Sequence, residues 1–570
     1  MKIKHLFGLA VIAAMTASCS SNEDLGTAGP GTGTNEAGVG YATFSINLPT
    51  TSGTRADGDP TFADGDANEY DVFNATLLVF EKPTKATSEG EYTFVEYVDL
   101  GSMQPWKSPS ETGVTTQAKI TAKLSTVNKS GENFALVLLN NGSGKDAKVT
   151  LPSKGDTFSA WNVATNATNF TDTKKGFYMA NAPLYNTTDK SVTTLVAIDK
   201  NKIFPTEAQA SSGEAAADIY VERGLAKVTL TTATNYGDVG GSYVGDKVEI
   251  SNWALDVTNK KTFPIHNVDG LNKDYPDIWN NAPTAAAPST QRFVDNSKAT
   301  AKRVYWGTDP NYKETNLSAE TKESKDARVE NFNYIKKEEL TAKPTDPQYC
   351  LENTFNLDNM MQGQTTRVIF KASYTPKDFT AADGKTFYKI GTSVALWKQK
   401  DFEAHIKAAV SKVFSVTTDD ITIKLDAKDN DITAAGNHVI TAANFTVKGH
   451  DTVTEAEEKA VNDKVGLTEK AGISTYANGE SYYIARIKHF GDAQTPWNSG
   501  VYGTDNLAYL GRYGMLRNNW YQLNVQSVSG PGYPDVPDVK PTTPDDEDDK
   551  YIKVSVKILS WAKRSQNVKL

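Results

Sequence analysis

The chain has 570 residues, 38% of them apolar, and a formal net charge of −9. This length predicts two or more domains of ordinary globular composition, and the negative charge argues against nucleic acid as a partner. The charge is unevenly placed, because residues 551–570 hold five Lys or Arg and no acidic residue, which leaves −14 for residues 1–550. A basic tail of this kind would be steered toward an acidic body.

The first residues predict a lipoprotein signal peptide over 1–19. Lys2 and Lys4 precede an apolar run and then small residues up to Cys19, the expected site of lipidation (a palmitate-type anchor). The apolar run is too short to span a bilayer, and no later stretch approaches about 18 apolar residues, so we expect the precursor to meet the membrane through its lipid alone. Cys350 is the other cysteine, so no intramolecular disulfide is expected.

A spacer and a first strand are predicted to follow, over residues 20–55. The strand has alternating apolar and polar residues, which predicts one buried and one exposed face; its apolar residues are Ala42, Phe44, Ile46 and Leu48. Residues 50–58 then form a polar loop with the first arginine of the chain, Arg55. Such a loop is accessible to proteases, although a single arginine in a loop can also be no more than an exposed residue.

The rest of the chain predicts a mainly β fold with two β-sandwich-like domains, 56–217 and 218–530. The polar, Ala-rich stretch 206–217 is the expected boundary. Two stretches with helical spacing, 401–413 and 455–465, predict short helices in the second domain, and the long polar stretches 267–301 and 312–346 predict surface loops. The expected strands are β-branched or aromatic runs: 72–80, 92–98, 114–124, 134–140, 193–198, 220–230, 247–257, 366–374, 386–394, 421–425, 438–447, 481–489 and 520–528.

The C-terminal end predicts a Pro/Asp linker over 531–550 and a tail strand over 551–570. The linker has five prolines and an acidic run at 545–549, a composition too polar to fold alone. The tail alternates apolar and polar residues, slips by one position near Leu559, and ends on an apolar residue. It either closes a sheet of its own chain or completes a sheet of another copy by strand addition. Its apolar residues are Ile552, Val554, Val556, Ile558, Leu559, Trp561, Val568 and Leu570.

The sequence predicts no enzyme, cofactor or metal site. The six histidines form no HExxH motif or i,i+4 pair, which argues against zinc. Residues 142–145 lack the first glycine of a phosphate loop, residues 240–245 do not form a GxSxG elbow, and the aspartates at 426, 429 and 431 lack the spacing of a calcium loop, so we interpret all three as turns. The acidic run at 545–549 is interpreted as a solvated linker.

Several short motifs, taken in order, resemble those of a fimbrillin of Bacteroidetes-type bacteria, the major-subunit family of type V pili. Among them this chain is most similar to the shaft subunit of short (minor) fimbriae. The match runs along nearly the whole chain. The motifs are the lipoprotein signal, the first strand with Thr54-Arg55-Ala56, Tyr220–Val228 with its Val-Glu-Arg, Leu351–Thr354, Ala372–Lys377, Arg517–Tyr521 with Ser527–Gly530, and the tail with its linker.

The resemblance implies two transthyretin-like sandwich domains and a mechanism of assembly. A lipid-anchored precursor at the outer membrane would be cut between Arg55 and Ala56 by an Arg-specific protease, which removes the first strand and opens a groove. The tail strand of another copy would fill that groove by donor-strand exchange. Head-to-tail addition does not close on itself, so it makes a filament. The implied partners are other copies, accessory and anchor subunits and unidentified surface ligands, and the implied role is adhesion, co-aggregation, biofilm formation and virulence.

Two other functions remain open from the sequence. The chain can be a tip or accessory adhesin of the same family, although it has both a removable first strand and a tail to donate. It can also be a surface lipoprotein that binds glycans through exposed aromatic side chains such as Trp497, Trp520 and Tyr482.

Overall fold

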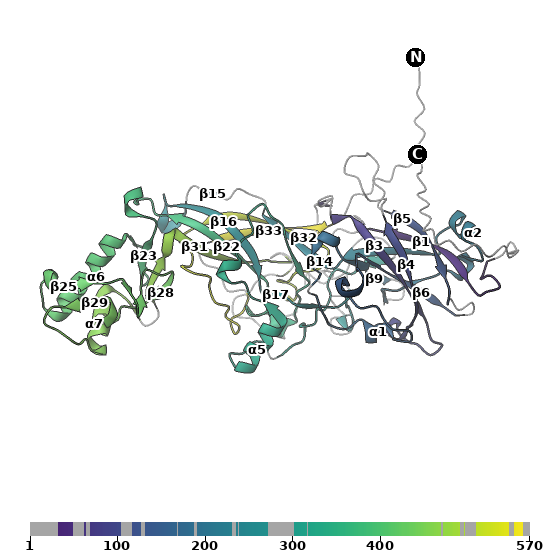
Figure 1. Cartoon of the computed structure of the whole chain (residues 1–570), viewed down its shortest axis with the longest axis horizontal. Helices are drawn as coiled ribbons and strands as arrows, with labels where there is room; N and C mark the ends of the chain where they lie inside the picture. The colour runs from purple at the N-terminus through teal and green to yellow at the C-terminus, as the bar shows by residue number, and fades with distance from the viewer. Residues whose placement is uncertain are drawn as a thin grey trace, which may run out of the picture.

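The computed structural model describes residues 32–48, 62–63, 69–103, 117–126, 131–167, 169–170, 172–186, 191–230, 235–236, 239–271, 301–315, 317–468, 471–490, 495, 509–545 and 552–561. For residues 62–63, 103, 173, 235–236, 301–303 and 552–561 the description covers the backbone alone. The described chain is mainly β, as predicted. It is elongated, with a first β domain at one end, a second β domain in the middle and a small module with two helices at the far end (Figure 1).

The first domain is one large sheet folded over a single apolar core. Its order is β12-β1-β13-β8-β6-β3-β4, with β5 paired to β1 and β11 paired to β6. Short helices α1 (Phe158–Trp161) and α2 (Glu207–Ser212) cover parts of it. The strand bounds are β1 Gly40–Asn47, β3 Val72–Glu81, β4 Thr93–Met103, β5 Gln117–Leu124, β6 Asn133–Leu139, β8 Met179–Asn181, β11 Val196–Ala197, β12 Ile203–Phe204 and β13 Ala217–Arg223.

The chain passes from the first domain to the second at Gly224. We predicted one strand over 220–230, but the stretch is two strands: β13 pairs with β1 in the first sheet, whereas β14 (Leu225–Leu230) pairs with β32 in the second. A Cβ at Gly224 would come 3.0 Å from the Tyr178 ring, so a glycine suits the crossing. The change of sheet therefore lies seven residues beyond the boundary predicted at 217, and the stretch 206–217 contains α2 rather than a linker.

Two sheets face each other in the second domain across one core. One has the order β2-β33-β32-β14-β21 and the other β15-β16-β22-β31. Trp253 of β16, Phe370 of β22 and Tyr521 of β32 are fully buried in that core. The remaining bounds are β2 Phe62–Ala63, β15 Asn235–Tyr236, β16 Lys247–Asp256, β21 Gln348–Leu351, β22 Arg367–Thr375, β31 Glu480–Arg486, β32 Asn519–Val528 and β33 Ile552–Trp561.

The far module has its own apolar core between helices and short strands. Helices α6 (Gln399–Phe414) and α7 (Glu455–Val465) confirm the two predicted helices. Its small sheets are β24-β23-β30-β28, β25-β29 and the hairpin β26-β27, which confirms the turn predicted at 426–431. The bounds are β23 Phe387–Ile390, β24 Leu396–Trp397, β25 Ile421–Ile423, β26 Asp426–Ala427, β27 Asn430–Asp431, β28 Gly436–His438, β29 Phe445–Val447 and β30 Ile473–Tyr476.

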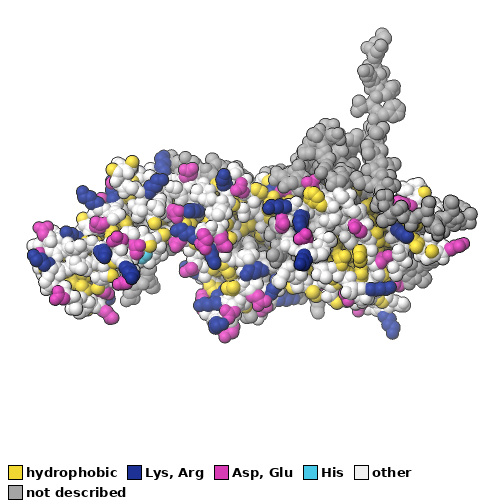
Figure 2. Space-filling model, viewed as in Figure 1, with side chains coloured by type: hydrophobic (Ala, Val, Ile, Leu, Met, Phe, Trp, Pro, Cys, Tyr) yellow, Lys and Arg dark blue, Asp and Glu magenta, His cyan; other side chains and the backbone are white. Residues whose placement is uncertain are grey.

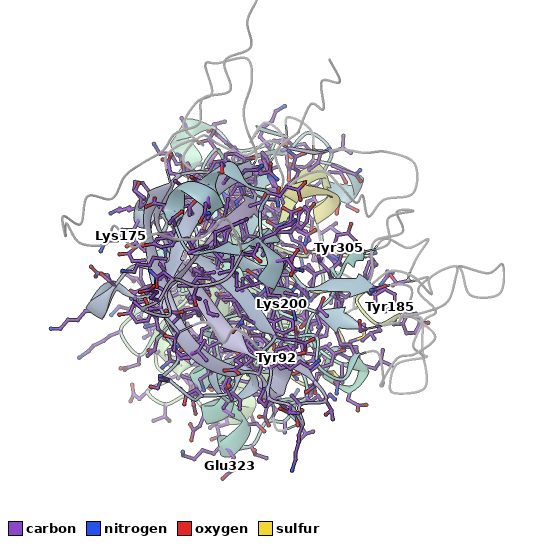
Figure 3. The ribbon with its side chains drawn as sticks, turned by 90° about the vertical axis from the view of Figure 1, so that its right-hand side faces the viewer. Tyr92, Lys175, Tyr185, Lys200, Tyr305 and Glu323 are labelled. Atoms are coloured by element: carbon purple, nitrogen blue, oxygen red, sulfur yellow. The ribbon has the colours of Figure 1, made fainter. Side chains whose placement is uncertain are left out.

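Short pairings join the two large domains. Tyr185, on the first-domain side, shares a small core with Tyr305, and the two lie on the same side of the molecule (Figure 3). Helix α5 (Lys322–Asn331) lies in the stretch 312–346, where we predicted a surface loop. The prediction missed this helix because its charged sequence has no apolar stripe. The joining strands are β7 Thr165–Asn166 with β18 Lys261–Thr262, and β9 Leu184–Asn186, in a hairpin with β10 Val192–Thr193, with β19 Ala301–Arg303. Within the second domain, β17 Thr258–Asn259 pairs with β20 Phe332–Asn333.

Candidate assembly site

Strand β1 lies inside the first sheet, with hydrogen-bonded neighbours on both edges. Strand β5 runs antiparallel along its whole length, from Gly40 opposite Leu124 to Asn47 opposite Gln117. The other edge is shared: β12 pairs with Tyr41 and Ala42, and β13 runs parallel to residues 44–47. Removing β1 would therefore open two ladders at once.

The apolar face of β1 is part of the first-domain core. Ala42, Phe44 and Ile46 are 0% exposed and Leu48 is 1% exposed, as the alternation predicted. Burying a Phe, Ile or Leu side chain contributes about 1.5–3 kcal/mol, and a whole domain is stable by only about 5–15 kcal/mol. A first domain without β1 would lose a large share of its stability until another strand fills the gap.

The polar face of β1 is buried too, and here the predicted exposed face is wrong. Thr43 and Ser45 are 3% exposed and Asn47 is 8% exposed. The Thr43 hydroxyl donates to the Ala210 carbonyl of α2 at 2.8 Å, and the Asn47 amide donates to Asp218 Oδ1 at 2.6 Å and to the Ile219 carbonyl at 3.1 Å. Helix α2 covers this face, so the gap left by β1, which we call the β1 slot, has two walls.

The predicted cleavage and lipidation sites, Arg55, Ala56 and Cys19, lie outside the described residues. The chain is described again at β2, whose backbone pairs in parallel with residues 560–561 of β33, and then from Glu69. Glu69 is fully buried: its carboxylate pairs with Lys227 at 2.5 Å and accepts from the Tyr349 hydroxyl at 2.9 Å. Glu69 therefore connects the chain beyond the predicted cleavage site to the second domain. The sequence analysis did not predict this contact.

The tail strand β33 is paired with its own chain in this structure. It runs antiparallel to β32, from Ile552 opposite Val528 to Ser560 opposite Asn519, with an irregularity between Val525 and Ser527. It is next to the edge of that sheet, with β2 as its other neighbour. The described part ends at Trp561, so Val568 and Leu570 lie outside it. The structure thus shows the tail in the first of its two predicted positions.

Up to Asp545 the predicted Pro/Asp linker lies against the second domain, although its composition is too polar to fold alone. Tyr533 exchanges backbone hydrogen bonds with Tyr482 on the free edge of β31, Pro537 O accepts from Arg367, and Asp545 N donates to Met360 O. The Asp545 side chain is 0% exposed and accepts from the Thr365 hydroxyl at 3.1 Å. Proline-rich sequence lacks a core of its own, but contacts supplied by the second domain hold residues 531–545, which we call the strap.

Several of the motifs that carried the family resemblance meet at the junction of the two domains. Glu222 of the Val-Glu-Arg motif bonds His266 Nδ1 at 2.7 Å, and Glu352 pairs with Arg517 at 3.1 Å. All four side chains are buried. Asn518 Oδ1 accepts from the backbone of Arg223. Breaking a buried ion pair leaves an uncompensated charge, so this cluster fixes how the domains join rather than forming a catalytic centre.

Side chains that could bind a metal ion do not gather in the described residues. Among them no group of three or more His, Cys, Asp or Glu side chains could hold a metal ion. Cys350 is buried in β21, where desolvation raises the pKa of its thiol to about 12, so it is unreactive. None of the helices in the described ranges is long and apolar enough to cross a membrane.

The two described aromatic residues among those named for glycan binding, Tyr482 and Trp520, do not form an exposed platform. Tyr482 is 0% exposed within β31. Trp520 is partly buried: its indole N–H donates to Thr229 and Lys227 Nζ lies 4.1 Å from its ring centre. Trp497 lies outside the described residues. On the face in Figure 2, cationic and anionic side chains are intermixed over all three parts of the molecule.

Comparison with known proteins then gives one informative match. Residues 474–567 match the family model described as major fimbrial subunit protein type IV, Fimbrillin, C-terminal. The C-terminal region is fimbrillin-like. This match includes β31, β32, the strap and β33, and it covers less than a fifth of the chain. It supports a structural role as a fimbrial subunit at the cell surface.

The other comparisons add little. No curated protein matches the chain. A solved structure of a candidate cell adhesion protein from Parabacteroides distasonis is 11% identical, covers 92% of this chain and 99% of its own, and has a TM-score of 0.33. A TM-score of that size does not establish a common fold.

Proposed function

We propose that the protein is the shaft subunit of a surface fimbria, closest to minor fimbriae, and that it polymerises by donor-strand exchange. The observation that carries the proposal is the position of β1. A strand near the N-terminus that ends just before the first arginine of the chain is fully buried between two ladders. Its removal leaves a defined slot in an otherwise complete domain.

The tail of a second copy fits the chemistry of that slot. Strand addition gains affinity from main-chain hydrogen bonds and specificity from alternate side chains, and the tail has four alternating apolar residues as β1 does. In a polymer, β33 would leave its ladder with β32 and its two-residue pairing with β2, and would complete two ladders in the neighbour. Because the donated strand is in one domain and the slot in the other, successive additions extend a filament.

Cleavage after Arg55 is the step that the proposal needs first. An Arg55→Ala variant should remain a lipidated monomer, whereas the wild-type fibre subunit should begin at Ala56. Mass spectrometry of surface-sheared fibres and a denaturing gel of unheated material give the mature N-terminus and the polymer ladder. A matched Lys82→Ala variant, with its side chain in a surface pair, should be cleaved normally. Fibre subunits that still begin near Cys19 would contradict the proposal.

Export as a lipoprotein is part of the same proposal. A Cys19→Ser variant should lose acylation and stop before the outer membrane, and surface fimbriae should fall accordingly. Metabolic labelling with a fatty acid and immunogold counting of fimbriae measure the two effects. Normal fimbriae on cells with the unacylated variant would show that export does not require the lipid.

A further inference from the structure

The β1 slot has features that choose one register for an incoming tail strand. This inference rests on the proposed function, since it concerns the slot left by β1 and the tail of a second copy. We infer that residues 551–558 of the second copy enter in the direction of β1, with Ile552 in the place of Ala42, and that Asp218 is the specificity residue that pairs with Lys557.

The core side of the slot accepts the tail in steps of two residues. In the inferred register Ile552, Val554, Val556 and Ile558 replace Ala42, Phe44, Ile46 and Leu48, so every inward position is apolar. The two sets are close in size, with fourteen side-chain carbon atoms against sixteen. Hydrophobic cores tolerate substitution when the total volume and the pattern are kept.

The α2 side of the slot separates this register from its neighbours. Lys119 of β5 is directly opposite Ser45 in the antiparallel pair. In the inferred register Ser555 takes the place of Ser45 and puts a hydroxyl opposite Lys119. A shift of two residues in either direction would put Lys553 or Lys557 there, and like charges directly opposite each other are destabilising.

The two shifted registers also fail at the core side. A shift toward the C-terminal end of the slot would carry Lys550 to the place of Ala42, which is 0% exposed. A shift toward the N-terminal end would carry Ile552 to the place of Gly40, where a Cβ comes 2.5 Å from Ile203 Cγ2. Burying an unpaired ammonium or overpacking a well-filled site is costly.

In the inferred register, Lys557 of the tail lies beside a residue of opposite charge, Asp218. Asn47 is the β1 residue that contacts the Asp218 carboxylate, at 2.6 Å, and its side chain also accepts from the Gln117 amide at 3.0 Å. Lys557 takes the place of Asn47, so the tail replaces an amide donor with a cation beside a carboxylate. Charge-assisted hydrogen bonds are stronger than neutral ones. At the other lysine position, Lys553 takes the place of Thr43, beside the Ala210 carbonyl.

The direction of insertion follows from the ladders. A reversed tail would keep the apolar side inward and would bring Lys553, instead of Lys557, beside Asp218. Reversal would make the eight-residue pairing with β5 parallel, and the hydrogen-bond spacing of a parallel ladder differs from that of an antiparallel one. The direction of β1 preserves both the antiparallel ladder with β5 and the parallel pairing with β13.

A charge-swap series in the cleaved, full-length chain tests the inference. Asp218→Lys alone and Lys557→Asp alone should each reduce the fraction of subunits in the polymer ladder, at fixed time and concentration, by about fivefold to tenfold, because an opposite-charge pair becomes a like-charge pair. The double variant Asp218→Lys with Lys557→Asp should restore the ladder to near the wild-type level. In 1 M salt the single-variant losses should shrink, because exposed charges are screened.

The controls give each outcome one meaning. Asp218→Lys combined with Lys553→Asp should stay defective; rescue by that pair instead would show a reversed strand and overturn the inference. No rescue by either pair, or no loss in the single variants, would overturn it as well. If Asp218→Lys does not melt cooperatively, Asp218→Asn replaces it, because the amide keeps an acceptor for Asn47 in the precursor. Asp218→Asn should reduce the fraction of subunits in the polymer ladder less than Asp218→Lys does. A wild-type chain that is cleaved and forms no ladder would contradict the proposed function itself, and so is distinguishable from a wrong register.

Discussion

Strands β1 and β33 have similar sequence patterns and opposite positions in the fold. β1 lies inside its sheet, pairs along both edges and is buried on both faces. β33 pairs with β32 over nearly its full length, and within the described residues its other edge pairs only with the two-residue strand β2. A strand near an edge can leave at the cost of one ladder, whereas an internal strand leaves two unpaired edges. This difference supports the proposal that the place of β1 is the accepting site and that β33 is the donated segment.

The largest effect should come from placing a charge in the donated strand. Val554→Asp would bring a carboxylate to the core side of the β1 slot, whose described lining is apolar, so the polymer ladder of the cleaved chain should be lost. The control Val554→Ile, which keeps an apolar branched side chain, should assemble. Gel ladders and electron microscopy measure the outcome. A variant that assembles normally while its monomer melts at a lower temperature would show that β33 only closes its own sheet.

Truncating the buried aromatic of β1 should separate the precursor from the polymer. Phe44→Ala should lower the free energy of unfolding of the uncleaved chain by about 3–5 kcal/mol, because it leaves a cavity in the first-domain core. After cleavage the residue is gone, so the polymer should melt as the wild type does. The comparison uses calorimetry of precursor and fibre. A fibre destabilised by the same amount would mean that β1 stays in the assembled subunit.

A smaller effect is expected where the strap ends. Asp545→Ala removes a buried acceptor from the Thr365 hydroxyl, which should cost about 1–2 kcal/mol in the stability of the second domain. Asp538→Ala, on an exposed part of the same strap, should change stability little. Denaturant unfolding of the uncleaved chain measures both. Equal effects of the two variants would contradict an anchored strap.

The strap also limits where a donated tail can reach. Six residues, 546–551, lie between Asp545 and Ile552, and at about 3.3–3.6 Å per residue the seven steps of chain span at most about 25 Å. A free linker from 531 onward would have allowed a far longer reach. The neighbouring slot must therefore come close to the second domain of the donor for exchange to occur.

The sequence by itself determined the local elements of this protein. Period-2 alternation located β1 and β33, and period-3.6 spacing located α6 and α7, because these patterns reflect which side chains of one segment face a core. Runs of β-branched and aromatic residues located β16, β22 and β32. The same alternation named the core residues of β1 correctly, from Ala42 to Leu48.

What the tertiary structure alone decided depends on contacts between distant segments. The hydrogen bond from Thr43 to α2 and the docking of the strap through Asp545 each join residues more than a hundred positions apart, and the change of sheet at Gly224 divides one uniform pattern in two. From sequence alone, a polar residue on a strand is predicted to be exposed, because the element that supplies its hydrogen-bond partner is not known. A proline-rich segment is likewise predicted to be unbound, because the surface that binds its carbonyl groups is not known. Whether a residue is buried depends on the distant segment that packs against it as well as on the residue itself. These features could therefore be seen only in the folded chain.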